Sequence, residues 1–264
     1  KMHERDEASI VNAAFWRKNA MEGQSFTRPW LDLERASLER YARGELDAVP
    51  ETLSQIYPSG ILADVAGKDV LCLASGGGQQ SAVFGLLGAR VTVVDIVEEQ
   101  LEGDKRAAEH YGYDVTLIQS DMRDLSLLPD GAFDLVFQAP SMGYVPEIRG
   151  MYAECARVLR AGGLYRVDAA NPAAQFVEES WDGKGYRIVK PYSRREFLRD
   201  DGAVEYRHYL GDIFNGLIGE GFMIEHVCEA PWHLRNASAA APGSWEHMLA
   251  HIPWLFAIVA RRVK

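Results

Sequence analysis

A run of three glycines between a strand and a helix offers backbone N–H groups to a ligand. Residues Asp69–Leu73 are of the buried-strand type, glycines occupy 76–78, and 82–87 have helical character. Glycine lets the backbone approach a ligand closely, and the start of the following helix favours negative charge. Nineteen positions after Gly76, a second apolar run ends in Asp95, an acid placed to accept both hydroxyls of a ribose. The arrangement indicates a binding site for a nucleoside cofactor.

Two classes of cofactor-binding domain use a loop of this kind. Domains that bind dinucleotides require the pattern Gly-x-Gly-x-x-Gly, whereas this window has Ser81 in place of the third glycine, which is a weak match. The second class needs only a short glycine loop and is distinguished by markers further along the chain. An NAD-dependent oxidoreductase therefore stays open here as an alternative.

The markers of the second class follow in order. The third apolar run, 115–118, leads to Asp121 and Met122. The fourth run, 132–137, follows a turn signal and leads to Gln138. Polar residues directly after consecutive strands lie together at the carboxyl edge of a parallel sheet, where ligands bind.

The rest of the chain continues the alternation of helix and strand. A helix is predicted after Pro146 from its apolar spacing, and the glycines at 162–163 are expected to end it. The fifth strand is expected at 164–168, and the last two at 223–229 and 255–261. Such alternation indicates a mainly parallel sheet.

With these markers in place, residues 60–264 closely resemble a class I S-adenosylmethionine-dependent methyltransferase of the small-molecule branch, types 11 and 25. The resemblance implies an α/β, Rossmann-like fold: a seven-stranded, mostly parallel sheet with an antiparallel last strand and helices on both faces. It implies in-line transfer of a methyl group from S-adenosylmethionine to a small-molecule acceptor, leaving S-adenosylhomocysteine. A module that binds S-adenosylmethionine without catalysis is a further alternative.

The resemblance also implies which residues hold the cofactor. Asp95 is expected on the ribose, Asp121 and Met122 on the adenine, and Gln138 near the methionine part. The full set of expected cofactor residues is Ala74, Ser75, Gly76, Gly78, Gln80, Asp95, Ile96, Asp121, Met122 and Gln138.

Two positions depart from the family pattern. Cys72 stands where the first strand usually carries an acid, so Gln79 or Gln80 is expected to replace its contact to the methionine end. Ala74 replaces the first glycine of the loop, which an alanine tolerates at a negative φ. A negative φ is therefore expected at Ala74.

The chain divides into a cap and a main domain. Residues 1–60 are expected to form an N-terminal helical cap, and 61–264 the methyltransferase domain, with insertions at 171–205 and 230–253 that wall the acceptor pocket. Helices are expected at 9–20, 31–43, 50–57 and 206–220, a hairpin turn at 182–185 and a short strand at 185–192.

Candidate acceptor-site residues are mostly aromatic. His208 is the expected general base because histidine titrates near neutrality, although a packing histidine at a helix start is the alternative. His247 and His251 lie four apart, but no third ligand is evident and no metal site is predicted. The residues expected to line the acceptor pocket are Phe15, Trp16, Trp30, Tyr144 and His233.

Composition limits the partners. The formal charge of −10, from 28 basic and 38 acidic residues, argues against a nucleic-acid substrate, because such binders usually present a basic face. No apolar stretch approaches the length needed to span a membrane. The three separated cysteines are typical of buried thiols in a reducing compartment, so a cytoplasmic protein is expected, as a monomer or a homodimer.

Overall fold

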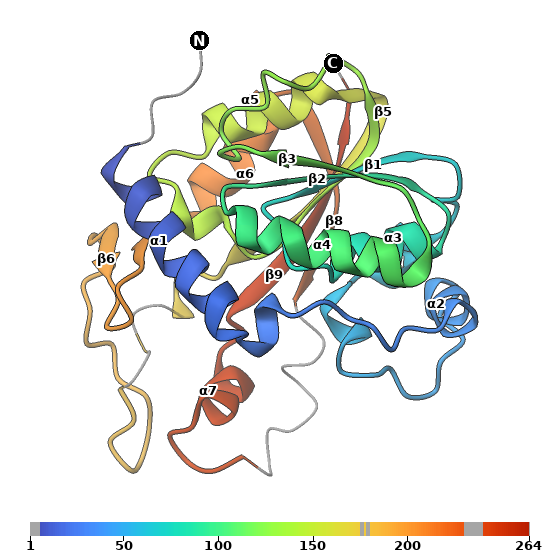
Figure 1. Cartoon of the computed structure of the whole chain (residues 1–264). Coiled ribbons are helices and arrows are strands. Elements are labelled where there is room, and N and C mark those ends of the chain that lie inside the picture. Colours follow the sequence, from blue (N-terminus) through green and yellow to red (C-terminus); the bar gives the residue numbers. More distant parts are fainter. Residues whose placement is uncertain (1–5, 175–176, 178–179, 230–239, 264) are drawn as a thin grey trace.

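The computed structural model describes residues 6–174, 177, 180–229 and 240–263. Its centre is one seven-stranded sheet in the order β3-β2-β1-β4-β5-β9-β8 (Figure 1). The first five strands along the chain pair in parallel, and β9 runs antiparallel to both of its neighbours. This confirms the predicted fold class. The strands are β1 Asp69–Leu73, β2 Arg90–Asp95, β3 Val115–Gln119, β4 Phe133–Gln138, β5 Leu159–Ala170, β8 Phe222–Glu229 and β9 Leu255–Arg262.

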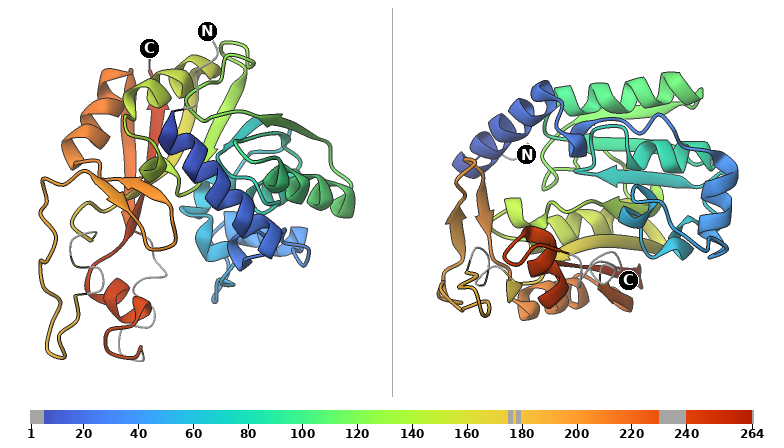
Figure 2. Two further views of the ribbon diagram at one scale, coloured as in Figure 1. Left: turned by 60° about the vertical axis from the view of Figure 1, so that its left-hand side comes forward. Right: turned by 90° about the horizontal axis from the view of Figure 1, so that it is seen from below.

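Helices cover both faces of the sheet, as the fold class requires. Helices α3 and α4 pack on one face, and α5 and α6 on the other (Figure 2). A separate apolar cluster lies on each face. The helices are α1 Glu7–Glu22, α2 Arg35–Ala42, α3 Gln80–Leu86, α4 Glu98–Tyr111, α5 Arg149–Val158, α6 Leu210–Gly219 and α7 Trp245–His251.

The N-terminal segment is less helical than predicted. Helix α1 is longer than expected, because Asp6 caps its first turn and Gly23 ends it in the left-handed conformation. The helix expected at 31–43 begins only at Arg35. The helix expected at 50–57 is wrong: only the 3₁₀ turn η2 Leu53–Gln55 forms. Pro58 follows directly after residues 50–57, and a proline disfavours helical backbone in the residue before it.

The boundary between α5 and β5 also differs from the prediction. The helix ends at Val158, and β5 starts directly at Leu159 instead of after the glycines. Gly162 has a φ of 79° within this strand, so it allows a local irregularity and does not stop the helix.

The first insertion forms a hairpin that the sequence did not indicate. The turn at 182–185 is confirmed, but the strand expected at 185–192 is wrong, since only Tyr186 makes a bridge there. Strands β6 Glu196–Leu198 and β7 Val204–Tyr206 pair instead. Residues 204–206 are thus extended, and α6 begins later than expected, at Leu210, where Tyr209 and Asp212 form a capping box.

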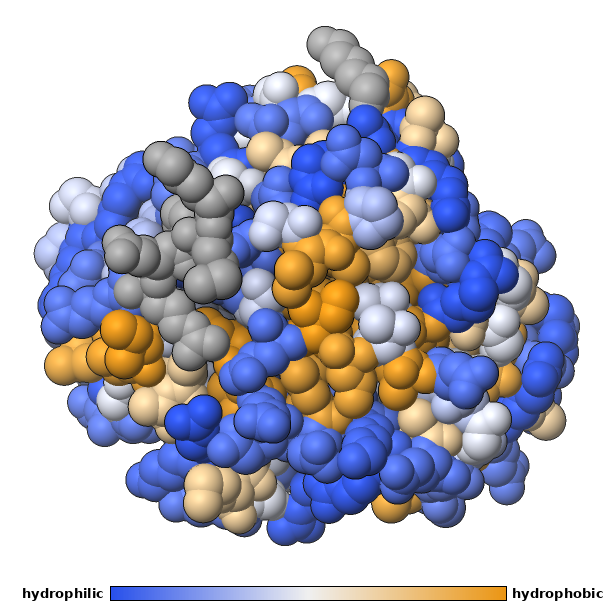
Figure 3. Space-filling model, turned by 45° about the horizontal axis from the view of Figure 1, so that its top comes forward, coloured by the Kyte–Doolittle hydropathy of each residue, from blue (hydrophilic) through white to orange (hydrophobic). Residues whose placement is uncertain are grey.

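One face of the molecule carries an apolar patch within a polar surround. On the face shown in Figure 3, polar side chains surround one patch of apolar ones. Apolar atoms commonly contribute more than half of a folded surface, so such a patch is ordinary. In the described part of the chain, no helix combines the length and apolar character needed to cross a membrane.

Candidate functional site

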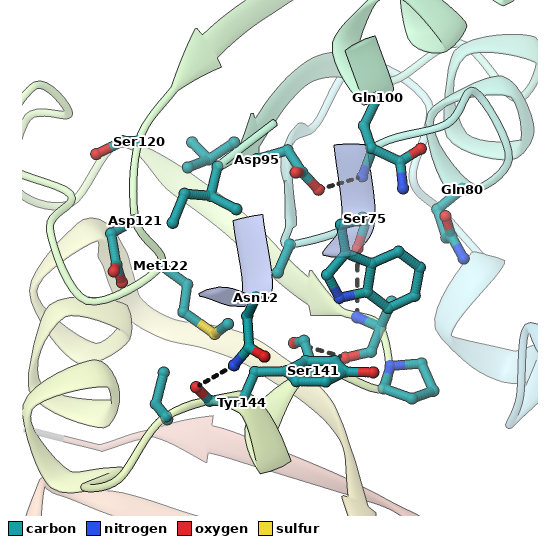
Figure 4. Close-up of a pocket in the computed structure, with 18 of the residues that line it drawn as sticks. Asn12, Ser75, Gln80, Asp95, Gln100, Ser120, Asp121, Met122, Ser141 and Tyr144 are labelled. Atoms are coloured by element: carbon teal, nitrogen blue, oxygen red, sulfur yellow. Dashed lines mark hydrogen bonds between the residues drawn. The ribbon is translucent and has the colours of Figure 1, made fainter. Parts of the chain in front are cut away.

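A cavity of about 250 Å³ lies at the carboxyl ends of β1, β2 and β4 (Figure 4). Eight of the ten expected cofactor residues line it, and Gly78 and Gln138 do not. The sheet brings these residues together because the loops after adjacent parallel strands share one edge. The lining members of the expected set are Ala74, Ser75, Gly76, Gln80, Asp95, Ile96, Asp121 and Met122.

Asp95 connects the glycine loop to the end of β2. Its Oδ2 accepts from the Gly76 N–H (2.9 Å) and its Oδ1 from the Val97 N–H (3.0 Å). Each carboxylate oxygen can accept a second hydrogen bond, and the side chain lines the cavity. Burial raises the pKa of Asp95 to about 6. The carboxylate therefore fixes the loop and keeps acceptor capacity for a ligand.

The other two glycines of the loop turn away from the cavity. The Gly77 and Gly78 N–H groups donate to Asp104 on α4 (3.0 and 3.1 Å). A Cβ at Gly78 would lie 2.3 Å from the Gly103 carbonyl oxygen. Gly78 is not part of the cavity lining, and its lack of a side chain allows the loop to pack on α4, so its expected contact with the cofactor stays a prediction.

Asp104 is a site residue that the sequence analysis missed. It is fully buried and accepts a third hydrogen bond from the Ser81 hydroxyl. Burial raises its pKa to about 7. A signal was present, because Asp104 interrupts the apolar stripe formed by Leu101 and Ala107, and buried acids need partners.

Ala74 adopts a φ of 47°, so the expected negative φ is wrong. For an L-residue this left-handed conformation costs about 1–2 kcal/mol. The position is held by the Ala74 N–H, which donates to the Val94 carbonyl (2.8 Å), and by Ser75, whose Oγ donates to the Leu73 carbonyl (2.9 Å). The strain is confined to the turn that leads from β1 into the cavity wall.

Asp121 is paired within the chain. Its Oδ1 accepts from the Arg123 backbone N–H and Nε (both 2.9 Å), and its Oδ2 from Arg123 Nη2 (2.7 Å). Arg123 also contacts Asp6 at the start of α1 (2.7 Å). Only Oδ2 keeps ready acceptor capacity, so the expected adenine contact stays a prediction.

Three glutamines have different surroundings. Gln138 is fully buried, accepts from the Tyr165 hydroxyl and donates to Ser141 Oγ (2.9 Å), so it supports the loop after β4 from below. Gln79 donates to the Ser25 and Arg28 carbonyls. Gln80 lines the cavity, and its amide makes no hydrogen bond within the described residues. Gln80 is thus the better placed of the two candidates for the methionine end.

The predicted aromatic residues divide into two groups. Trp16 and Tyr144 line the cavity with edge-to-face rings 5.7 Å apart. Phe15 packs beside Trp16 but is not part of the lining, and Trp30 is buried in the apolar cluster next to α2. The spacing of apolar residues in α1 does not show which face of the helix points to the cavity, so the sequence could not distinguish Trp16 from Phe15. His233 lies outside the described residues.

His208 does not line a described cavity. It is buried, its Nε2 lies 3.2 Å from the Met142 carbonyl, and burial lowers its pKa. This geometry supports the packing alternative over the general base. Within the described ranges, no three His, Cys, Asp or Glu side chains are grouped to hold a metal.

Two further polar residues of the cavity were not predicted. Gln100, on α4, is buried, and its Oε1 lacks a hydrogen-bond partner. Asn12, on α1, donates to the Val204 carbonyl (2.9 Å) and the Tyr144 carbonyl (3.3 Å), which ties α1 to β7 and to the loop after β4. A buried oxygen without a donor is costly unless a ligand satisfies it.

Comparisons with known proteins agree with this geometry. The sequence model of the methyltransferase domain family matches residues 71–167. An uncharacterized methyltransferase of Bacillus subtilis, YbaJ, is 30% identical over 225 residues, which span 81% of this chain and 87% of that protein. The chain is a class I S-adenosylmethionine-dependent methyltransferase. Its cofactor is S-adenosylmethionine, and the NAD-dependent oxidoreductase and the non-catalytic module are not retained as alternatives.

Two other similarities extend this result. The crystal structure of an S-adenosylmethionine-dependent methyltransferase from Mesorhizobium loti superposes with a TM-score of 0.62 at 25% identity, covering 77% of this chain and 94% of that one. A ubiquinone biosynthesis O-methyltransferase of Xanthomonas oryzae is 31% identical over 113 residues, 42% of this chain and 47% of that protein.

Proposed function

We propose that the cavity beside Asp95 binds S-adenosylmethionine and that this methyltransferase acts on a small-molecule acceptor. The observation that carries the cofactor site is the Asp95 carboxylate, which holds Gly76 on one side and faces the cavity on the other. The unpartnered Oε1 of Gln100 adds an acceptor on the same wall. Ile96 and Met122 supply apolar contact for a base.

The protein's contribution is orientation and exclusion of water. When bound, S-adenosylmethionine would supply an electrophilic methyl group for in-line transfer to the acceptor, with S-adenosylhomocysteine as the leaving group. Asp95 would hold the hydroxyls, and Gln80 the amino-acid end. Trp16 and Tyr144 would cover the reacting atoms, which must stay aligned in a dry site.

Three observations support a small acceptor. The relatives include enzymes named for ubiquinone biosynthesis. The formal charge of −10 is unfavourable for nucleic acid. The cavity at the strand ends is enclosed on one side by α1, through Asn12 and the pair between Asp6 and Arg123, which leaves little room for a folded macromolecule.

The test is transfer of labelled methyl from S-adenosylmethionine into three fractions of one cell extract: small molecules, RNA and protein. We expect label in the small-molecule fraction, and much less of it with Asp95→Ala at the same concentration of S-adenosylmethionine. Label confined to RNA or protein would refute the acceptor class. The division at residue 60, the monomer or homodimer state and the cytoplasmic location stay predictions.

A further inference from the structure

A second cavity, of about 620 Å³, adjoins the first one. The two cavities share Gln55, Gln80 and Pro140 in their walls. The second one lies where β5 ends and β9 begins, because Leu255, which pairs with Ala170, lines it, and helix α7 contributes Trp245, Glu246 and Leu249 to its wall. A ligand in this space would therefore border the cofactor cavity along the side that holds Gln80.

Gln80 points to a ligand at the boundary between the cavities. The side chain is only 7% exposed, and its amide makes no hydrogen bond within the described residues. Its amide is not among the fully enclosed unpartnered groups of the described residues, so the amide is accessible from the cavities and can donate to and accept from a molecule there. The neighbouring Gln79, equally buried, uses its amide to bind two backbone carbonyls. The contrast shows that the Gln80 amide is open to both cavities, so it can hold the amino-acid end of S-adenosylmethionine and still border a ligand in the second cavity.

The walls of the second cavity combine apolar residues with polar ones, among them Ser54 and Gln55, and the charged groups in its described lining are acids. Among the described residues that line it, none is Lys, Arg or His. Three acids are present, Glu51, Asp168 and Glu246. The apolar and aromatic part consists of Val49, Tyr57, Phe137, Pro140, Trp245, Leu249 and Leu255.

The three acids are not equivalent. Asp168 is buried, bound by both terminal nitrogens of Arg166 and by the Tyr57 hydroxyl (2.8 Å), so its charge is neutralised. The carboxylates of Glu51 and Glu246 are exposed and make no hydrogen bond or ion pair with described residues. The net negative charge of the cavity therefore comes from the exposed Glu51 and Glu246, and the buried Asp168 adds little to it.

We propose that this second cavity is the acceptor site and that it selects an apolar molecule that carries a basic nitrogen, rejecting carboxylates and phosphates. The inference rests on the proposed function, because it names the acceptor of that same reaction. An exposed charge pair contributes only modestly to affinity. Two unpaired glutamates should therefore favour an ammonium over a carboxylate by roughly tenfold in affinity.

The test uses three probes with one apolar body: 4-phenylbutylamine, 4-phenylbutanol and 4-phenylbutyrate. Each is titrated by calorimetry into the whole protein saturated with S-adenosylhomocysteine. We expect the amine to bind most tightly and the carboxylate most weakly. Equal affinities, the reverse order, or no binding of any probe would overturn the inference. Failure of S-adenosylhomocysteine itself to bind would instead contradict the proposed function.

Charge variants separate the cavity from the overall charge of the protein. Glu51→Lys and Glu246→Lys alter exposed side chains, so folding should be retained, and each should reduce the preference for the amine by about fivefold. Glu109→Lys is the matched control, since Glu109 is exposed on α4, outside all described cavity walls. An equal effect of the control would show that net charge, and not this cavity, sets the preference.

Discussion

The glycine loop is bound by two carboxylates, Asp95 on the side of the cavity and Asp104 on the buried side, and their surroundings differ. Asp95 lies on the cavity side and accepts two backbone N–H groups while it still lines the cavity. Asp104 lies on the buried side and accepts two N–H groups and a hydroxyl, with no exposed surface. The loop is thus fixed by α4 on its buried side, and the part formed by Ala74, Ser75 and Gly76 faces the cavity.

The largest effect should come from the buried face. Asp104→Ala leaves Gly77, Gly78 and Ser81 with unpartnered donors, so we expect a loss of about 3 kcal/mol in the free energy of unfolding. Asp95→Ala should cost only about 1 kcal/mol, because water in the cavity can reach the freed N–H groups. Urea denaturation of both variants measures the difference. Equal losses would contradict the division between the two faces.

The affinity for S-adenosylhomocysteine should show the opposite order, with the larger loss in Asp95→Ala and the smaller one in Asp104→Ala. Asp95→Ala removes two charge-assisted hydrogen bonds to the ribose, so S-adenosylhomocysteine should bind about 100-fold more weakly. The measurement is calorimetric titration, with NAD as the control ligand. A folded Asp95→Ala protein that binds S-adenosylhomocysteine as tightly as the parent would place the ribose elsewhere.

The roles of Asp95 and Asp104 also differ in how far they could be predicted from the sequence. Asp95 was predictable, because an acid at the end of a strand next to a glycine loop must lie at the shared edge of the sheet. The role of Asp104 depends on how the loop folds back onto α4, which no local pattern states. The second cavity is formed by Tyr57, Asp168 and Leu249, which are far apart in sequence. Only the folded chain brings them together.

The pH dependence of cofactor affinity should sharpen the assignment of Asp95. Hydroxyl donors require the ionised carboxylate, and burial raises the pKa of Asp95 to about 6. The ionised fraction falls as the pH drops through that value, so affinity at pH 5 should be about tenfold lower than at pH 7.5.

Asp95→Asn provides the control for this dependence. Its affinity for S-adenosylhomocysteine should be low and flat between pH 5 and 6.5, since the titrating group is gone. A slope that persists in Asp95→Asn would assign the titration to another group, and Asp104, whose pKa lies at about 7, is the nearest candidate.

The smallest effect concerns the wall opposite the loop, where α1 closes the cavity. Asp6 caps α1 through the Ser9 N–H (2.9 Å) and pairs with Arg123, which lowers the pKa of Asp6 to about 2. Asp6→Ala should cost about 1 kcal/mol of helix stability. We expect faster amide exchange in α1 and roughly threefold weaker binding of S-adenosylhomocysteine.

Glu22→Ala, at the far end of α1, is the matched control, because Glu22 makes only long, exposed contacts within the described residues, with Lys18 (3.9 Å) and with Gln24 Nε2 (3.5 Å). It should change neither exchange in the first turns nor affinity. If Asp6→Ala loosened α1 without weakening S-adenosylhomocysteine, the helix would not hold the cofactor. The wall formed by Trp16 would then serve the acceptor, and the fixed loop between Asp95 and Asp104 would carry cofactor affinity by itself.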